Sequence, residues 1–245
     1  MNKCTVSIIC CYNNEDVMQN MLYKSVLDQN MNCEFIPVDN RYNKFASAAS
    51  ALNYGASVSN GEYLVFTHQD IEFNDSTCIQ SVVNYLDELG KAIVGFAGRK
   101  AEDSKVYSNM KHGINEIYAG DKRISAPTIV QTLDECFIAL KRDLFLNYGF
   151  DEKACDNWHL YTVDLCLDMG RHNIKSYAIP SYAFHKSSGV LNEGYFKSLN
   201  KIVAKYRKDY RKIYSTCSIV KTNAACYLLY RMSRKIKFMI KKYIK

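Results

Sequence analysis

The sequence has little proline and glycine, and several functional motifs are missing from it. Only 3 of its 245 residues are proline and 11 are glycine, and neither GxGxxG nor GxxxxGK[ST] occurs. A bound nucleotide therefore does not rest on a phosphate-cradling glycine loop of either type. The GxSxG turn is also absent, which disfavours a serine hydrolase that exposes its nucleophile there.

Long apolar runs and paired cysteines are missing as well. No run of about eighteen uncharged apolar residues occurs, so the sequence predicts no membrane-spanning helix. The first residues, MNKCTVSIICCYNN, enter a strand pattern directly, and we expect no signal peptide. The ten cysteines include no CxxC pair, which disfavours zinc. Most of them lie in apolar segments, which is typical of reduced core thiols in the cytosol.

Charge is distributed unevenly along the chain. Residues 201–245 contain 14 Lys or Arg and one acid, Asp209, whereas residues 1–200 contain 18 basic and 24 acidic residues. The formal net charge of +7 therefore combines an acidic body with a basic tail. We divide the chain into a domain at 1–206, with halves at 1–98 and 99–206, and a basic helical tail at 207–245.

The first half alternates strand and helix patterns. Strands are predicted at 5–12, 33–40, 63–66 and 92–98, and helices at 15–29, 47–59 and 75–89. This order predicts an α/β fold with a mostly parallel, Rossmann-type sheet and helices on both faces.

The second half is less regular. Residues 99–127 are polar and weakly periodic, which predicts a long loop, and two short strands are expected around Asp134 and Glu135. Beyond these we predict a helix at 158–169 ended by Gly170, a strand at 174–179, a loop at 181–189 and a helix at 193–206.

Polar residues follow three of the predicted strands. They form the groups Tyr12-Asn13-Asn14, Asp39-Asn40 and His68-Gln69-Asp70. Parallel sheets bind ligands outside the carboxyl ends of their strands, so we expect these groups to meet at one edge. A nucleotide diphosphate could be held there by a divalent cation on a carboxylate.

The segments VSIICCYNNED, FIPVDN and GEYLVFTHQDIEF together resemble the family 2 glycosyltransferases of GT-A fold. The resemblance implies a base-binding position at the end of the first strand, an aspartate that bonds the base, and a metal-binding DXD motif at the third strand. The implied nucleotide-binding residues are Tyr12, Asn14, Asp39, His68 and Gln69, and the implied metal ligand is Asp70.

Two later segments extend the resemblance to about residues 6–189. GFDEKACDNWHLYTVDLCLDMG is similar to the family's acceptor segment, and AIPSYAFHKSSG to a histidine loop that supplies a further metal ligand, here His185. Trp158, His159 and Glu135 are the acceptor-binding residues expected from this comparison.

The sequence departs from the family pattern at two places. His68 stands at the first position of the DXD motif, and Tyr161 and Thr162 stand where the family has its Glu-Asp pair. The usual general base is thus missing, and an acceptor hydroxyl still needs a carboxylate to take its proton. Asp164 is our first candidate for this base and Asp134 the second.

The expected function is inverting transfer of a sugar from a nucleotide-diphosphate donor to a hydroxyl, by single displacement. Mn²⁺ or Mg²⁺ is the expected cofactor, and a nitrogen ligand favours Mn²⁺. The alternatives are a nucleotidyltransferase and a noncatalytic nucleotide-sugar-binding protein. We expect no nucleic-acid partner.

The last eighteen residues, taken as a helix at about 100° per residue, have an apolar half and a cationic half. The apolar half holds Leu228, Leu229, Met232, Ile236, Met239, Ile240, Tyr243 and Ile244. Arg231, Arg234, Lys235, Lys237, Lys241, Lys242 and Lys245 lie on the other half, and only Tyr230 and Phe238 break the division. The pattern predicts a helix in an anionic membrane interface at the cytoplasmic face, which suits a lipid-linked or surface-polysaccharide acceptor. A surface helix packed on its own domain is the alternative.

Overall fold

The computed structural model describes residues 5–187 and 191–243, with side chains of the last helix described through Arg234. A seven-stranded sheet in the order β10-β13-β5-β12-β3-β1-β2 forms its centre. Strands β1, β2, β3, β5 and β13 run in one direction, and β10 and β12 run in the other. The mostly parallel α/β class expected from the sequence is confirmed.

Most strands of the central sheet agree with the predicted segments, but the strand predicted at 92–98 is divided after Gly95, and its second part belongs to another sheet. The strands of the central sheet are β1 (Val6–Tyr12), β2 (Cys33–Asp39), β3 (Tyr63–Thr67), β5 (Ala92–Gly95), β10 (Thr128–Val130), β12 (Phe137–Lys141) and β13 (Lys175–Ala178).

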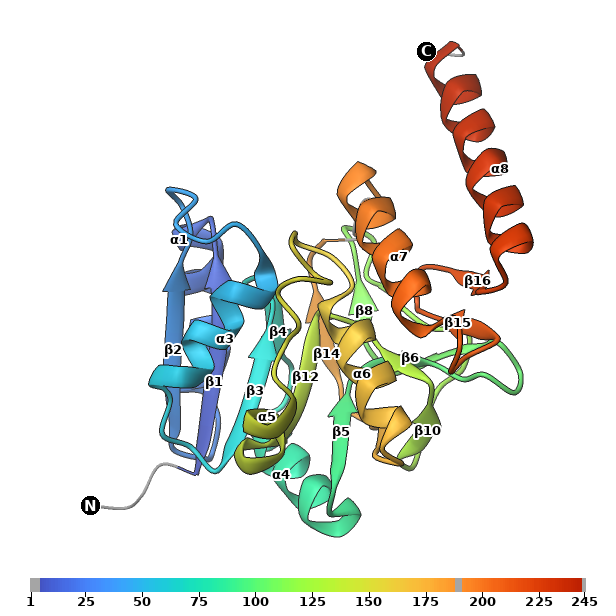
Figure 1. Ribbon diagram of the computed structural model, residues 1–245. Coiled ribbons are helices and arrows are strands. Elements are labelled where there is room, and N and C mark those ends of the chain that lie inside the picture. Colours follow the sequence, from blue (N-terminus) through green and yellow to red (C-terminus); the bar gives the residue numbers. More distant parts are fainter. Residues whose placement is uncertain (1–4, 188–190, 244–245) are drawn as a thin grey trace.

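Helices cover both faces of this sheet. One face packs on α3 (Ala48–Val58), α5 (Arg142–Tyr148), α6 (Tyr161–Arg171) and α7 (Glu193–Tyr206), of which α3, α5 and α6 lie in front of the sheet in Figure 1. The other face packs on α4 (Cys78–Leu89) and on the continuous helix formed by α1 (Glu15–Val17), the π-helical η1 (Met18–Tyr23) and α2 (Lys24–Leu27). Neighbouring strand residues separate accordingly: Ile9 joins the first core and Ile8 the second.

Capping and close packing explain where several helices lie. Asn14 caps α1 by accepting a hydrogen bond from the Val17 backbone N–H at 3.1 Å, and Ser47 caps α3 by accepting one from Ser50 N–H at 3.1 Å. Helix α3 is rich in small residues because it lies against β1. A Cβ at Gly55 would come within 2.4 Å of Ile9 Cγ2.

Helix α6 differs from its prediction at both ends. It begins at Tyr161, three residues later than expected, because Leu160 adopts a left-handed φ of 68°. It also continues through Gly170 to Arg171. Gly170 serves close packing, since a Cβ there would lie 2.6 Å from the Tyr210 hydroxyl. That hydroxyl donates a hydrogen bond to the Leu167 carbonyl at 2.8 Å.

Short strands occupy the region predicted as a long loop. One small sheet joins β6 (Ala97–Arg99), β7 (Val106–Ser108) and β11 (Thr132–Leu133), and another joins β4 (Ile71–Phe73), β14 (Ala183–His185), β8 (Lys111–His112) and β9 (Ile117–Tyr118). The predicted loops at 99–127 and 181–189 are therefore corrected within the described residues. Strands this short show no recognisable period in the sequence.

The segment beyond residue 206 has two parts. A hairpin of β15 (Lys212–Tyr214) and β16 (Ile219–Lys221) packs on the body, with Ile213 and Val220 each 1% exposed within its main core. Helix α8 (Ala224–Tyr243) packs on the body through Tyr227 and Tyr230 and extends past the carboxyl ends of β2 and β5 (Figure 1).

Candidate functional site

His68, Asp70 and His185 form a cluster at the carboxyl end of β3. Each offers one ligand atom, and these atoms all lie within 4.8 Å of one another. His185 Nε2 is 3.3 Å from Asp70 Oδ1 and 3.4 Å from His68 Nδ1. The sequence separates His68 from His185 by 117 positions, so only the fold brings His68, which we expected to bind the nucleotide, to the expected metal ligands Asp70 and His185.

Backbone pairing fixes the three side chains. The His68 N–H donates to the Cys136 carbonyl at 3.0 Å, which ties the end of β3 to the start of β12. Strand β14 pairs with β4 and places His185 opposite Ile71, next to Asp70. The Ser187 N–H donates to Asp70 Oδ2 at 3.1 Å. These bonds hold the cluster before any ion binds.

Electrostatics keep the cluster able to bind a cation. Burial lowers the pKa of His68 to about 4, helped by the nearby His185. Burial acts to raise the pKa of Asp70, but the hydrogen bond from His185 and the charges of both histidines hold it below its usual value. At neutral pH His68 is a neutral nitrogen donor and Asp70 is a carboxylate, which are the forms that coordinate metals.

Tyr161 and Glu135 connect helix α6 to the cluster. The Tyr161 hydroxyl lies 3.4 Å from His68 Nε2 and donates to the Glu135 carbonyl at 3.2 Å. The Glu135 carboxyl accepts hydrogen bonds from the backbone N–H groups of Leu160 and Tyr161, although its Oε1 has no partner among the described residues. Burial raises the pKa of Glu135 well above its ordinary value. Glu135 thus caps α6, whose own N-cap residue offers no side-chain bond.

Asp134 lies within electrostatic range of the cluster. Burial acts to raise its pKa, but hydrogen bonds from Thr216 and the Cys136 N–H, together with His185, hold the pKa below its usual value. The Thr216 hydroxyl donates to Asp134 Oδ2 at 2.6 Å. Thr216 lies between β15 and β16, so the hairpin beyond residue 206 supports this carboxylate.

Asp164, our first candidate for the base, lies in a different environment. It is 2% exposed, and both of its carboxylate oxygens accept hydrogen bonds from Lys205 Nζ at 2.9 Å. Lys205 also pairs with Asp151 at 2.8 Å. Burial raises the pKa of Asp164. The pKa of Lys205 is raised by its two carboxylate partners, Asp151 and Asp164. Because Lys205 contacts two carboxylates, we treat the pair as ionised.

No hydrogen bond or ion pair within residues 5–187 and 191–243 joins Asp164 to His68, Asp70 or His185. The contacts of Asp164 are those of a structural ion pair in the core. Of the two candidates, Asp134 is the one whose charge interacts with His185 of the cluster.

Arg41 occupies the predicted base-binding position. Asp39 accepts hydrogen bonds from Arg41 Nε at 3.0 and 3.1 Å, and Arg41 also pairs with Glu15. The guanidinium lies 5.6 Å from the centre of the Tyr12 ring. The side-chain and backbone hydrogen bonds of Arg41 lower the pKa of Asp39 to about 2. The two residues expected to bind the base are thus bridged by one cation that the sequence reading did not identify.

Gln69 joins the loops that follow β1 and β3. Its Oε1 accepts hydrogen bonds from the backbone N–H groups of Asn13 and Asn14, both at 3.0 Å, and its Nε2 donates to Asn13 Oδ1 at 2.9 Å. Together with the capping role of Asn14, this clamp shapes the edge at which a nucleotide is expected.

The expected acceptor residues precede α6. Trp158 is 42% exposed, and the His159 ring lies 5.9 Å from the ring of Tyr195 in an edge-on arrangement. Burial lowers the pKa of His159, against a hydrogen bond with Asn192.

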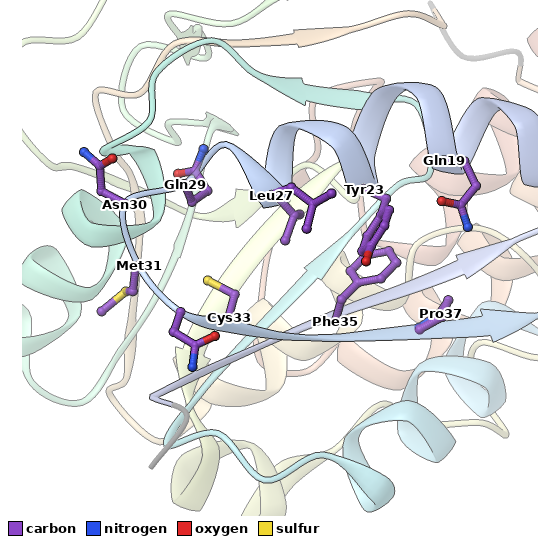
Figure 2. Close-up of a pocket in the computed structure, with 11 residues that line it drawn as sticks. Gln19, Tyr23, Leu27, Gln29, Asn30, Met31, Cys33, Phe35 and Pro37 are labelled. Carbon is purple, nitrogen blue, oxygen red and sulfur yellow. The ribbon is translucent and has the colours of Figure 1, made fainter. Parts of the chain in front are cut away.

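A surface groove lies away from the cluster. Its volume is about 670 Å³, and it runs between the helix α1–η1–α2 and the edge strand β2. Figure 2 shows Tyr23, Leu27 and Phe35 in the groove, with Gln19 and Pro37 at one end. It shares no residue with His68, Asp70 and His185, so we place the chemistry at the cluster and not in this groove.

Residues 7–214 match the family described as "Glycosyltransferase like family". The chain belongs to this glycosyltransferase-like family. A relative from Fuscovulum blasticum, described as "ATP synthase subunits region ORF 6", is 26% identical over 183 residues, which cover 71% of this chain and 72% of the relative. The family match over residues 7–214 confirms the resemblance to family 2 glycosyltransferases that the sequence motifs indicated.

Solved structures confirm the GT-A fold of this family member. GalNAc-T7 with UDP, GalNAc and Mn²⁺ has a TM-score of 0.63 at 12% identity, over 85% of this chain and 49% of that one. S. aureus TarS has a TM-score of 0.56 at 15% identity, over 84% and 40%. The mannosyltransferase PcManGT from Pyrobaculum calidifontis, with GDP-Man and Mn²⁺, has a TM-score of 0.56 at 16% identity, over 86% and 66%. The chain thus spans less than two thirds of each of these structures.

None of the helices within the described ranges has the length and apolar character needed to cross a bilayer.

Sequence reading missed three residues that shape the site. Arg41 and Thr216 gave no signal, because an arginine after a strand and a threonine in a hairpin are common on any surface. Tyr161 was noted only as a departure from the family pattern, yet its hydroxyl contacts His68. Only its position beside Trp158 and His159 pointed toward the site.

Proposed function

We propose that this chain is an inverting glycosyltransferase that moves a sugar from a nucleotide-diphosphate donor, such as a UDP-sugar, to a hydroxyl group. The observation that carries the proposal is the convergence of His68, Asp70 and His185 at the carboxyl end of β3. In an open α/β sheet this is the edge where ligands bind.

The three residues fit a divalent cation. Two imidazole nitrogens and one carboxylate oxygen, all within 4.8 Å of one another, can reach a common ion. Imidazole ligands suit Mn²⁺ better than Mg²⁺, which prefers oxygen. When bound, such an ion stabilises the negative charge that develops on the leaving diphosphate.

Residues of the chain supply recognition and proton transfer. We assign recognition of the nucleotide's base to Tyr12 and Asp39. Because Arg41 bridges these two residues, it must either move away or contact the nucleotide itself when the nucleotide binds. Asp134 accepts the proton of the attacking hydroxyl, supported by its bond to Thr216 and its position near His185. Glu135 and Tyr161 position the start of α6 beside His68. A single displacement of this kind inverts the anomeric centre.

The acceptor lies on the side of Trp158 and His159. An exposed indole next to a polar run suits a sugar ring. We propose a lipid-linked or surface-polysaccharide glycan as the acceptor.

The test combines binding and turnover. Thermal shifts with a panel of nucleotide sugars and Mn²⁺ identify the donor, and release of the nucleoside diphosphate then measures hydrolysis or transfer. For the parent, we expect a nucleotide sugar that raises the melting temperature and release of the nucleoside diphosphate that depends on metal. Asp28→Asn, which changes an exposed carboxylate, is the control and should behave in the same way. Donor binding without any release would identify a noncatalytic nucleotide-sugar-binding protein, and release of pyrophosphate from a nucleoside triphosphate would identify a nucleotidyltransferase.

A further inference from the structure

Helix α8 packs on the body by its polar and aromatic side. The Tyr227 hydroxyl donates to Asn200 Oδ1 of α7 at 2.7 Å, and the Arg234 guanidinium lies 4.9 Å from the ring of Phe196, also on α7. Tyr230 is partly buried against the main core. Tyr230, which interrupts the cationic half in the sequence, is therefore explained by this contact.

The apolar side of α8 faces the opposite way. Leu228, Leu229 and Met232 are 55%, 66% and 52% exposed. At about 100° per residue, Met232 lies roughly 160° around the helix from both Tyr230 and Arg234. A surface helix normally turns its apolar stripe toward its own core. Here the body holds the other side, so the apolar stripe points away from the protein.

Charge identifies what covers this stripe. Residues 210–245 contain no Asp or Glu, whereas residues 231–245 contain seven Lys or Arg. The side chains of residues 235–245 lie outside the described ones, but the helix itself continues to Tyr243. An apolar stripe on a helix whose only charged residues are cations complements an anionic bilayer surface, where acyl chains take the stripe and headgroups take the charges. A second copy would instead bring two cationic flanks together.

We infer that α8 is an interfacial membrane anchor, held by Tyr227, Tyr230 and Arg234 so that Leu228, Leu229 and Met232 enter an anionic leaflet. The inference deepens the proposed function by naming the surface on which the acceptor is met. Its test needs no sugar transfer.

The test uses the full chain with substitutions in the exposed stripe. Truncation before β16 is unsuitable, because the hairpin carries Thr216 and buries Val220. The triple variant Leu228→Gln, Leu229→Gln, Met232→Gln keeps helix-forming residues and all charges. Arg231→Lys, which keeps the charge at an exposed position on the cationic half of the same helix, is the matched control.

Sedimentation with phosphatidylcholine vesicles containing 0 to about 40% phosphatidylserine gives the readout. We expect parent binding to rise with the anionic fraction and to fall with salt. The lipid partition coefficient of the triple variant should be at least about tenfold lower than that of the parent. Arg231→Lys should keep the parent value.

Three results would overturn the inference: equal pelleting of parent and triple variant, parent binding that ignores charge and salt, or a parent dimer that the triple variant converts to a monomer without vesicle binding. Nucleotide-sugar binding, measured by calorimetry without lipid, separates the two proposals. A triple variant that keeps donor binding and loses vesicles supports the anchor alone, and a parent that binds vesicles but no donor refutes only the proposed function.

Discussion

Two residues of helix α6, one turn apart, reach two different polar clusters. Tyr161 contacts His68, beside Asp70 and His185, and Asp164 contacts Lys205. The pKa of Asp70 is lowered and that of Asp164 is raised, although burial opposes ionisation at both. The difference lies in the partners: Asp70 is half-buried at a strand end with two imidazoles, whereas Asp164 is enclosed in the core with one lysine. A carboxylate in a family segment therefore cannot be assigned to catalysis without its neighbours.

Asp70→Asn is the strongest test of the first cluster. Removing the carboxylate takes away the charged ligand, and we expect sugar transfer to fall by at least about a hundredfold, as when a group that stabilises transition-state charge is lost. Excess chelator should have the same effect on the parent. Initial rates with Mn²⁺ and a melting curve check this, and parent-like activity in Asp70→Asn would refute the metal assignment.

Asp134→Asn separates the two base candidates. Loss of a general base costs about 10²–10⁴-fold, so turnover should fall strongly while the donor dissociation constant stays within about twofold. Single-turnover rates and calorimetry measure the two quantities. Asp164→Asn is the paired control, and a larger loss of turnover there would return the role to Asp164.

Asp164→Ala tests the second cluster. It leaves the charge of Lys205 facing only Asp151 in a half-buried position, so unfolding free energy should fall by about 3 kcal/mol. Urea denaturation measures the change, and turnover per folded molecule should be preserved. The double variant Asp164→Leu, Lys205→Met should recover part of the loss, since it removes both buried charges. A stable but inactive Asp164→Ala would contradict the structural role.

Arg41→Ala has the smallest expected effect. An exposed ion pair is worth about 0–1 kcal/mol, so freeing Asp39 and Tyr12 should tighten nucleotide binding by no more than about fivefold. Asp39→Ala should weaken nucleotide binding, and this variant should show a larger increase in KM than decrease in kcat. Calorimetry with the nucleoside diphosphate measures the dissociation constant of each variant, and Lys24→Ala, at an exposed position, is the control. Weaker binding in Arg41→Ala would show instead that the guanidinium contacts the bound nucleotide.

Periodic segments were predictable because their residues report burial directly. Strands such as Val6–Tyr12 are continuous apolar runs, and helix Glu193–Tyr206 was predicted at its observed bounds. The strands within residues 99–127 could not be predicted, because strands of two or three residues show no periodic pattern. The hairpin at 212–221 was assigned to the tail because its two buried apolar residues, Ile213 and Val220, stand among basic neighbours.

The α/β class, the edge of the sheet that gathers polar residues, and the amphipathic pattern of the last helix all follow from the amino-acid sequence. These depend on local periodicity and on the order of strands and helices. Three other features became visible in the folded chain: His185 contacts Asp70, Asp164 pairs with Lys205, and α8 turns its apolar stripe outward. Each of these depends on contacts between residues far apart in the chain, and no local pattern specifies which distant side chain will lie opposite.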